Sequence, residues 1–351
     1  MKKFLVILLV AALALTSAFA GGSSESTAPE AAAASVEQHP EYKGVVMLYT
    51  STGEDVVLKL KEAFQAKYPN VDMQYYYAGS GKVVTKLSTE FETNAVTADI
   101  VWMADPSALL TWKKEGKLTP YKSPFAADIN EIFKDSDDMF TAARMIIMGI
   151  TYSTIATSDK EAPTTFWDMT KPEWKNQIVM SDPSNAGSTK TTVYALLHSD
   201  KYGWDFFKAL KANGCELESS TGNTHNKVAA GAYKLCIGVD YNTKNMMDAG
   251  SPLGFHNTTD VVVAVPCPIA IPKGNPNPEL AKLLYDFLID PEGGQKVLAN
   301  DYNMTVTNAK TAIPAGMIHS EEAARIALPV DWPDLQANGK AMLAEFDKLF
   351  K

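Results

Sequence analysis

Three stretches in the first part of the chain repeat one order of hydrophobic and polar positions: an apolar run, a polar loop and a helical pattern. The apolar runs at 45–49, 71–77 and 99–103 are short and rich in β-branched and aromatic residues, as buried strands are. This alternation is typical of an open α/β domain whose sheet is largely parallel. Because ligands bind beyond the carboxyl ends of such strands, we expect the three loops to gather at one edge of the sheet.

A second α/β unit is predicted further along the chain. Its strands are the apolar runs at 178–180 and 235–239, and each run ends in polar residues. Two longer apolar runs, at 145–157 and 261–271, are suited to carry the chain across from the first unit and back. We therefore predict an α/β protein of two lobes joined by two crossover strands. A hinge between the lobes would let them close on a small ligand.

The chain begins with a pattern that is typical of export. Lys2 and Lys3 precede an apolar run at 4–15 and an Ala-x-Ala site, so a signal peptide is predicted at 1–20 with cleavage after Ala20. The run is too short to span a bilayer comfortably, and no later stretch reaches the length of a membrane helix. The remaining boundaries follow: a flexible leader at 21–42, an N-terminal lobe at 43–150 and 265–351 whose C-terminal helices partly brace both lobes, and a C-terminal lobe at 151–264.

The stretch 178–192, IVMSDPSNAGSTKTT, carries the strongest candidate for ligand chemistry. Its apolar strand ends in a polar loop, and a helix follows. The first amides of a helix have no internal partner, and its N-terminus carries partial positive charge. Gly187, Ser188 and Thr189 are therefore predicted to bind a phosphate, phosphonate or carboxylate. The alternative is that Ser188 or Thr189 only caps the helix.

Polar residues in other loops complete the predicted site. Ser51, Thr52 and Ser80 supply neutral donors, which suit a buried oxyanion because they carry no desolvated charge of their own. Asp105 and Asp240 are candidates for the other end of the ligand, where a carboxylate would accept hydrogen bonds from hydroxyls or pair with an ammonium group.

Each of these assignments has a structural alternative. Tyr241 is predicted to be a wall of the cleft, although a buried tyrosine also occurs in a core. Asp105, which precedes a proline, is also suited to cap a helix, and Asp240 to start a turn. Thr221 and Asn223 are predicted to be helix caps rather than ligands.

Composition and charge narrow the class of partner. The 351 residues are 46% hydrophobic and 21% charged, with a formal net charge of −9. A nucleic-acid-binding protein usually shows a basic face, so none is expected as a partner. Neither a metal motif nor a cofactor motif is found. The chain has three cysteines, Cys215, Cys236 and Cys267, so at least one thiol is free. The sequence is compatible with a Cys215–Cys236 disulfide and with three buried free thiols.

Five segments, in this order, resemble the extracytoplasmic solute-binding proteins of ABC transporters, in the subfamily typified by ferric-iron-binding proteins. They are VVMLYTSTGED (45–55), YYYAGSGKV (75–83), ADIVWMADPSALLTWKKEGKL (98–118), AAGAYKLCIGVDY (229–241) and PCPIAIPKGNPNPELAKLLYDFLIDPEGGQKVLA (266–299). The resemblance implies the periplasmic-binding-protein fold of type II and a periplasmic location. It also implies a monomer that is not an enzyme and that delivers a small ligand to an inner-membrane permease.

The subfamily binds iron, phosphorylated sugars, phosphonates or thiamine. Its iron-binding members use two adjacent tyrosines after the strand that here ends at Val239, whereas this chain has Asp240-Tyr241-Asn242, with one tyrosine. Fe(III) prefers phenolate or carboxylate oxygen, so the missing tyrosine favours a small organic anion with a phosphate or phosphonate group. Ferric iron is the alternative ligand within the family. Thiamine, which could stack on tryptophans such as Trp112, is a minor alternative.

An exported phosphoester hydrolase is the alternative from another class. Such chemistry usually needs a metal cluster or an activated nucleophile with a base. His198, His225 and His256 have no catalytic motif around them, and no GxSxG sequence is present. The sequence therefore favours binding over turnover.

Overall fold

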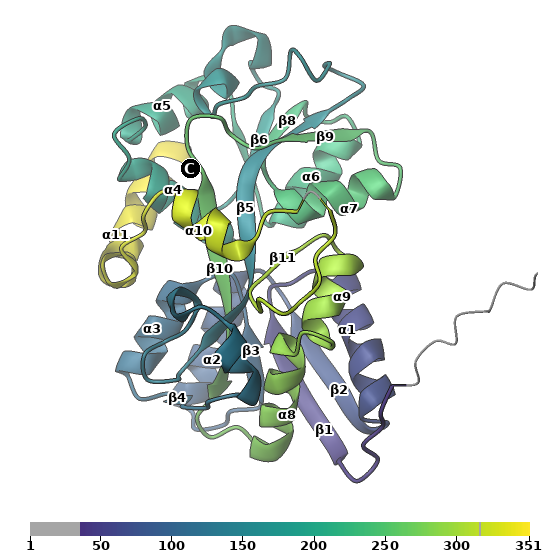
Figure 1. The fold of residues 1–351 in the computed structure, drawn as a ribbon. Coiled ribbons are helices and arrows are strands. Elements are labelled where there is room, and N and C mark those ends of the chain that lie inside the picture. Colours follow the sequence, from purple (N-terminus) through teal and green to yellow (C-terminus); the bar gives the residue numbers. More distant parts are fainter. Residues whose placement is uncertain (1–35, 316) are drawn as a thin grey trace, which may run out of the picture. The chain divides into compact units, whose positions relative to one another are not determined.

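Two long antiparallel strands, β5 (Thr141–Ser153) and β10 (Val263–Pro272), run between two lobes of the molecule (Figure 1). The structure is a computed structural model that describes residues 36–315 and 317–351. The predicted signal peptide and most of the predicted leader lie outside the described residues. Residues 37–351 form one unit of the chain, and it is this unit that is described below.

The lower lobe in Figure 1 is built from the three repeats predicted in the first part of the chain. β1 pairs in parallel with β2 on one side and β3 on the other, and β3 pairs antiparallel with the end of β10. The elements are β1 (Lys43–Thr50), α1 (Glu54–Lys67), β2 (Asn70–Tyr77), α2 (Ser80–Glu92), β3 (Ile100–Trp102) and α3 (Pro106–Lys114).

The upper lobe repeats the arrangement of strand, loop and helix. β6 pairs in parallel with β7 and β8, and β8 pairs antiparallel with the second half of β5. The elements are β6 (Ile178–Ser181), α4 (Gly187–Leu197), α5 (Trp204–Ala212), β7 (Glu216–Glu218), α6 (Thr221–Ala229), β8 (Leu235–Val239), α7 (Asp240–Asp248) and β9 (Leu253–His256).

The rest of the chain covers this framework. The last helix, α11, lies against α3 of the lower lobe and against α4 and α5 of the upper lobe. Tyr194 of α4 donates to Asp334 of α11 at 2.7 Å, and Phe207 of α5 packs on Phe346. The remaining helices and strands are β4 (Leu118–Thr119), α8 (Pro278–Ile289), α9 (Gly294–Asn300), β11 (Thr305–Val306), α10 (Ser320–Ile326) and α11 (Trp332–Phe350). Short 3-10 turns are at Pro124–Asp128, Glu131–Phe133, Trp167–Thr170 and Pro172–Trp174.

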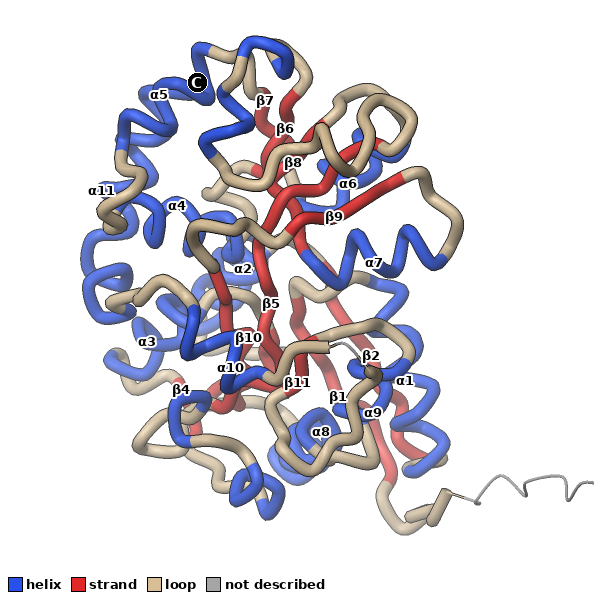
Figure 2. Tube along the Cα trace, turned by 45° about the horizontal axis from the view of Figure 1, so that its top comes forward, coloured by secondary structure: helices blue, strands red, loops and turns tan. Residues whose placement is uncertain are grey.

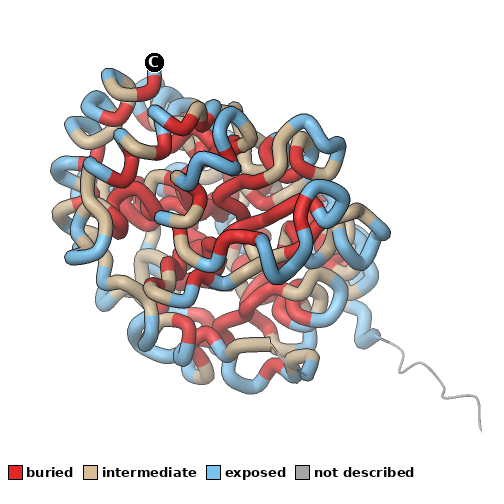
Figure 3. Tube along the Cα trace, turned by 90° about the horizontal axis from the view of Figure 1, so that it is seen from above, coloured by how far each residue is buried: buried red, intermediate tan, exposed pale blue. Residues whose placement is uncertain are grey.

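The strands form the centre of the unit, and the helices lie outside them (Figure 2). All thirteen residues of β5 are buried, because β5 has strand neighbours at its edges and helices over its faces. Seen from above, buried segments fill the middle of the unit and exposed ones its margin (Figure 3). A strand of this kind accepts an almost continuous apolar sequence, which is why the crossover was readable from the hydrophobic pattern.

The predicted α/β class with two crossover strands is confirmed, with differences at element ends. The first crossover strand is β5, which begins at Thr141, earlier than predicted, and therefore includes Arg144. The polar stretch at 219–224 contains the start of α6, which begins at Thr221. Asp240, for which the start of a turn was the structural alternative, begins a helix, α7, directly after β8. Polar residues that open a helix carry the same local signals as a loop.

Candidate functional site

A small cavity between the lobes is surrounded by the N-terminal ends of four helices. It encloses about 40 Å³. Among its lining residues, Gly79 and Ser80 lie at the start of α2, Gly187 and Ser188 at the start of α4, and others at the starts of α6 and α7. The full lining is Ser51, Tyr77, Gly79, Ser80, Ala104, Arg144, Ile146, Asn185, Ala186, Gly187, Ser188, Ser220, Thr221, Val239 and Tyr241. Four helix N-termini make the surroundings electropositive.

The lobes meet beside this cavity through backbone atoms. A Cβ on Gly79 of the lower lobe would lie 2.7 Å from the carbonyl oxygen of Asn185 in the upper lobe. The amide of Gly81 donates to that same carbonyl oxygen at 3.2 Å. On the other side, a Cβ on Gly187 would collide with the Ala104 carbonyl. Glycine is therefore needed at these positions for the lobes to close this far.

The N-terminus of α4 has no side-chain cap. Its N-cap residue is Ala186, and the first backbone bond into the helix comes from Lys190 to the Ala186 carbonyl at 2.9 Å. Among the described residues, the amides of Gly187, Ser188 and Thr189 have no hydrogen-bond acceptor. These are the unpaired donors of a helix start, and an anion in the cavity could accept from them.

Of the residues predicted in this stretch, Gly187 and Ser188 line the cavity and Thr189 does not. The Thr189 hydroxyl instead shares a hydrogen bond with the Ser181 hydroxyl at the end of β6, and both are buried. Ser51 and Ser80 also line the cavity. Thr52 is buried outside the lining, so the structure brings part of the predicted set together.

Arg144 is the main residue that sequence reasoning missed. It lies on β5, is 1% exposed and lines the cavity. Its Nη2 donates to Thr52 Oγ1 at 3.2 Å, whereas Nε and Nη1 have no partner among the described residues. The donors predicted from the sequence were neutral, and Arg144 adds a charged donor to the lining of the cavity. The sequence did contain a signal, because Arg144 is a single charged residue directly before the predicted strand at 145–157, and the residues before it, Ala142 and Ala143, are also apolar.

Two aromatic rings lie close to the Arg144 guanidinium. Its Cζ lies 4.7 Å from the centre of the Tyr241 ring and 5.3 Å from that of Trp102. Burial acts to lower the pKa of Arg144, but interaction with Tyr241, Cys267 and Asp240 outweighs it and leaves the pKa raised. The guanidinium is therefore a fixed positive charge, and two of its nitrogen atoms, Nε and Nη1, have no acceptor in the described part of the chain.

Asp105 lies outside the lining and has partners of its own. Its carboxylate accepts from the Ala108 amide at 3.3 Å and from the Ser107 hydroxyl at 2.7 Å, which makes it the N-cap of α3. Its other oxygen pairs with Lys190 of α4 at 2.5 Å. With the two side chains only 6% and 14% exposed, this is a buried ion pair between the lobes.

Asp240 and Tyr241 lie on the hinge side of the cavity. Tyr241 lines the cavity, as predicted for a cleft wall, whereas Asp240 does not. Asp240 Oδ1 accepts from the Ile147 amide of β5 at 3.2 Å and faces a second cavity of about 500 Å³. Burial raises the pKa of Asp240 to about 7, although backbone amides and Arg144 oppose the shift.

Two further residues differ from their predicted roles. Ser220, rather than Thr221 or Asn223, caps α6 by accepting from the Asn223 amide at 3.2 Å. Thr221 lines the cavity instead, together with Tyr77 and Asn185, which were not predicted. Tyr77 is the last residue of β2 and Asn185 lies in the loop before α4, and their placement at the cavity depends on the packing of the lobes.

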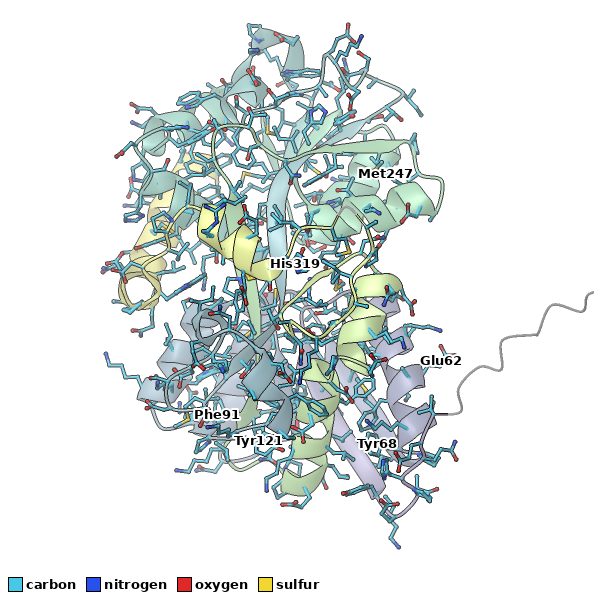
Figure 4. All side chains as sticks on the ribbon, viewed as in Figure 1. Glu62, Tyr68, Phe91, Tyr121, Met247 and His319 are labelled. Atoms are coloured by element: carbon cyan, nitrogen blue, oxygen red, sulfur yellow. The ribbon has the colours of Figure 1, made fainter. Side chains whose placement is uncertain are left out.

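The three cysteines and Trp112 lie outside the lining of the cavity. Cys215, Cys236 and Cys267 are buried free thiols, and burial raises the pKa of Cys267 to about 11. Trp112, a candidate for stacking on thiamine, packs on Phe91 at 5.7 Å. Figure 4 shows Phe91 in the lower lobe with Tyr68 and Tyr121, whereas Met247 lies on α7 of the upper lobe.

Within the described residues, no three His, Cys, Asp or Glu side chains gather where they could hold a metal ion. The helices of the same part of the chain also lack the combination of length and apolar character that a membrane crossing needs.

Comparison with known proteins gives one family and several structural relatives. Residues 95–326 match the family described as bacterial extracellular solute-binding protein. A putative 2-aminoethylphosphonate-binding periplasmic protein of Salmonella typhimurium is 23% identical over 253 residues, which cover 70% of this chain and 72% of that protein.

Two solved structures represent the range of structural relatives. The periplasmic binding protein AfuA from Actinobacillus pleuropneumoniae, with fructose-6-phosphate bound, has a TM-score of 0.77 at 22% identity and covers 88% of this chain and 99% of that chain. Iron-bound HitA from Pseudomonas aeruginosa has a TM-score of 0.73 at 14% identity and covers 86% and 99%. At these identities, the likeness establishes the two-lobed fold that was predicted.

Proposed function

The chain belongs to the family of bacterial extracellular solute-binding proteins, and we propose that its ligand is a small organic anion with a phosphate or phosphonate group. Proteins of this family serve ABC transporters, so the role is capture of a solute rather than catalysis. The proposed anion site is the cavity between the lobes, with Gly187 and Ser188 of α4 on one side and Arg144 on another.

The state of Arg144 carries this proposal. A buried guanidinium with two unpaired nitrogen atoms is costly unless a ligand supplies the missing acceptors. Two of the free amides at the start of α4 belong to Gly187 and Ser188, which line the same cavity, and they need the same kind of partner. A tetrahedral oxyanion has enough acceptor oxygens to satisfy both groups at once, which a single carboxylate does less completely.

The rest of the lining favours a ligand whose other end is neutral. It contains hydroxyl and amide side chains, including Ser51, Tyr77 and Asn185, but no carboxylate. Asp105 is paired with Lys190, and Asp240 faces the other cavity. A hydroxyl-rich phosphate ester such as a sugar phosphate therefore suits this lining better than an aminophosphonate, whose ammonium would find no carboxylate.

The alternatives are less well supported. In place of two adjacent tyrosines the chain has Tyr241 alone, which is held against the positive charge of Arg144. That charge opposes binding of a trivalent cation. For a hydrolase, the lining has no histidine, cysteine or carboxylate that could act as a base or nucleophile. We therefore propose binding without turnover.

We also propose that the chain acts in the periplasm, as a monomer, after cleavage behind Ala20. The family is extracellular, the N-terminal sequence is typical of a signal peptide, and the net charge of −9 suits a soluble carrier. Its macromolecular partner would be an inner-membrane ABC permease, with no nucleic acid and no resident cofactor.

The test is a calorimetric titration of the purified protein with fructose 6-phosphate, 2-aminoethylphosphonate, inorganic phosphate and ferric citrate. Binding of the sugar phosphate or the phosphonate, with no hydrolysis on prolonged incubation, is expected. Stronger binding of fructose 6-phosphate than of 2-aminoethylphosphonate would support a ligand whose other end is neutral. Binding of ferric citrate alone, or release of phosphate from the ester, would contradict the proposal.

A further inference from the structure

A buried histidine behind the wall of the cavity links two segments that line it. His225 lies in α6 and is fully buried. Its Nδ1 is 2.6 Å from the Thr221 carbonyl oxygen, and its Nε2 is 3.1 Å from the Val239 amide nitrogen. Both contacts are satisfied together when Nδ1 carries the proton and donates to Thr221, while Nε2 accepts from Val239.

On the side of β8 that faces β6, the contact with Val239 has no substitute in the sheet, whereas on the other side Val239 is in register with Met148 of β5. β8 pairs with β6 only through Leu235 and Cys236, so β6 has ended before the strand reaches Val239. Nε2 of His225 takes the place of the missing strand for this buried amide, which would otherwise be left without a partner. By contrast, the Thr221 carbonyl also accepts from the Thr224 hydroxyl at 2.6 Å.

Val239 directly precedes the first residues of α7, among which Tyr241 lines the proposed anion site. It is the N-cap of α7, and Tyr241 follows two positions later. The Tyr241 ring lies 4.7 Å from the Arg144 guanidinium carbon. A displacement of Val239 would therefore move the Tyr241 ring, which forms one face of the aromatic pair around Arg144.

We propose that His225 is a positioning residue for the ligand site: through its bond to the Val239 amide, it fixes the Tyr241 ring against Arg144. This inference rests on the proposed function, because it assumes that Arg144 binds the ligand. It extends that function by assigning a role in ligand affinity to a side chain that does not line the cavity. The neutral form is the one required, and burial lowers the pKa of His225, which favours that form.

Two conservative variants separate the contacts of His225. In His225→Asn, the side-chain amide can occupy the Nδ1 position and donate to Thr221, but the Val239 amide loses its acceptor. In His225→Gln, the side-chain oxygen can occupy the Nε2 position and accept from Val239. Asn213→Ala is the matched control, because Asn213 is a buried side chain of the same lobe that holds the Met169 and Lys171 carbonyls at 3.0 Å, away from the cavity.

The experiment measures the Kd for fructose 6-phosphate and for inorganic phosphate, and the Tm, of the wild-type protein and the three variants. For whichever probe the wild-type protein binds, we expect the Kd of His225→Asn to be at least about tenfold higher than that of the wild type. The Kd of His225→Gln should be close to the wild-type value. Asn213→Ala should lower the Tm while leaving the Kd within about twofold. An unchanged Kd in folded His225→Asn, or an equal loss of affinity in Asn213→Ala, would overturn the proposal.

Amide hydrogen exchange by NMR gives a second measurement that needs no ligand. The Val239 amide should exchange slowly in the wild-type protein and in His225→Gln, and much faster in His225→Asn. Equal protection in all three would overturn the role of His225 even if a ligand binds. If the wild-type protein binds no phosphorylated probe, the proposed function fails, and the exchange result still decides whether His225 holds this wall.

Discussion

The N-termini of α3 and α4 are built alike, but only the N-terminus of α3 has a carboxylate of the chain beside its free amides. Each helix follows a buried strand and a polar loop, and each begins where the two lobes meet. α3 has Asp105 as a side-chain cap, and that carboxylate is also paired with Lys190. α4 has Ala186 at the same position and no side-chain cap, and Arg144 adds a positive charge beside it.

Under the proposed function, this difference separates a structural helix start from one that binds the ligand. At α3, the positive end of the helix is already neutralised by a residue of the chain, so an external anion has little to gain there. At α4, the helix amides and a guanidinium face one cavity without a negative group among the lining residues. The terminus that lacks its own anion is the one suited to take an anion from solution.

Removal of the Arg144 charge is expected to have the largest effect on the α4 side. Arg144→Met keeps an apolar chain between Trp102 and Tyr241 but removes the charge-assisted donors, each worth about 1.5–3 kcal/mol. Affinity for fructose 6-phosphate should fall at least about 100-fold in a calorimetric titration. The free energy of unfolding without ligand should be unchanged or higher, because an incompletely paired buried charge is lost. A large loss of stability with unchanged affinity would assign Arg144 to the core.

The corresponding change on the α3 side should act on stability first. Asp105→Asn leaves Lys190 buried without its carboxylate, and loss of one partner of a buried pair costs about 3 kcal/mol. Urea unfolding of the ligand-free variant should show this loss. Lys171→Gln is the control, since Lys171 is exposed and pairs with Asp168 at the surface. Stability equal to the wild type, combined with a large loss of affinity, would instead place Asp105 at the ligand.

The start of α7 offers a third case, in which Asp240 is half-buried and faces the second cavity. Its pKa of about 7 is above the ordinary value of 3.8, so the folded state binds a proton more tightly than the unfolded state. This contribution is complete below pH 4 and is lost as the pH rises toward 7, at about 1.4 kcal/mol per pH unit. Asp240→Asn should remove this slope from the pH dependence of the unfolding free energy. An identical slope in the variant would contradict the assignment.

The smallest expected effects distinguish the two hydroxyls of α4. Ser188 lines the cavity, whereas Thr189 is bonded to Ser181. Ser188→Ala should weaken binding of fructose 6-phosphate about fivefold to tenfold, as loss of one hydrogen bond of about 1 kcal/mol predicts. Thr189→Ser keeps the hydroxyl and should leave affinity unchanged. Equal effects of the two changes on Kd would mean that the α4 terminus does not face the ligand as described.

The sequence was sufficient for the fold because the fold depends on long apolar patterns. The runs at 145–157 and 261–271 identified both crossover strands, since strands buried on both faces need little polar sequence. The stretch with Gly187 and Ser188 was found because a helix start has a local signature. These features are set by residues that are close together along the chain.

The composition of the site was less accessible, because it depends on contacts between distant segments. Asp105 and Asn223 are of residue types that occur both as ligands and as helix caps, so their roles cannot be told from the sequence. The charged partner of Asp105 is Lys190, which is 85 positions away along the chain. Arg144 was missed because a charge inside an apolar strand has no local explanation. Its neighbours come from β3, α7 and the loop that holds Thr52, and the sequence does not reveal how those segments pack.

The most direct test of the account gives α4 the carboxylate that α3 already has. Ala186→Asp should supply an internal anion at the start of α4, and Ala186→Asn supplies a cap of nearly the same size without the charge. Calorimetric titration with fructose 6-phosphate should show a loss of affinity of at least about 30-fold in Ala186→Asp and a much smaller loss in Ala186→Asn. Equal affinities in the two variants would contradict the claim that the uncapped terminus of α4, with Arg144, is the anion site.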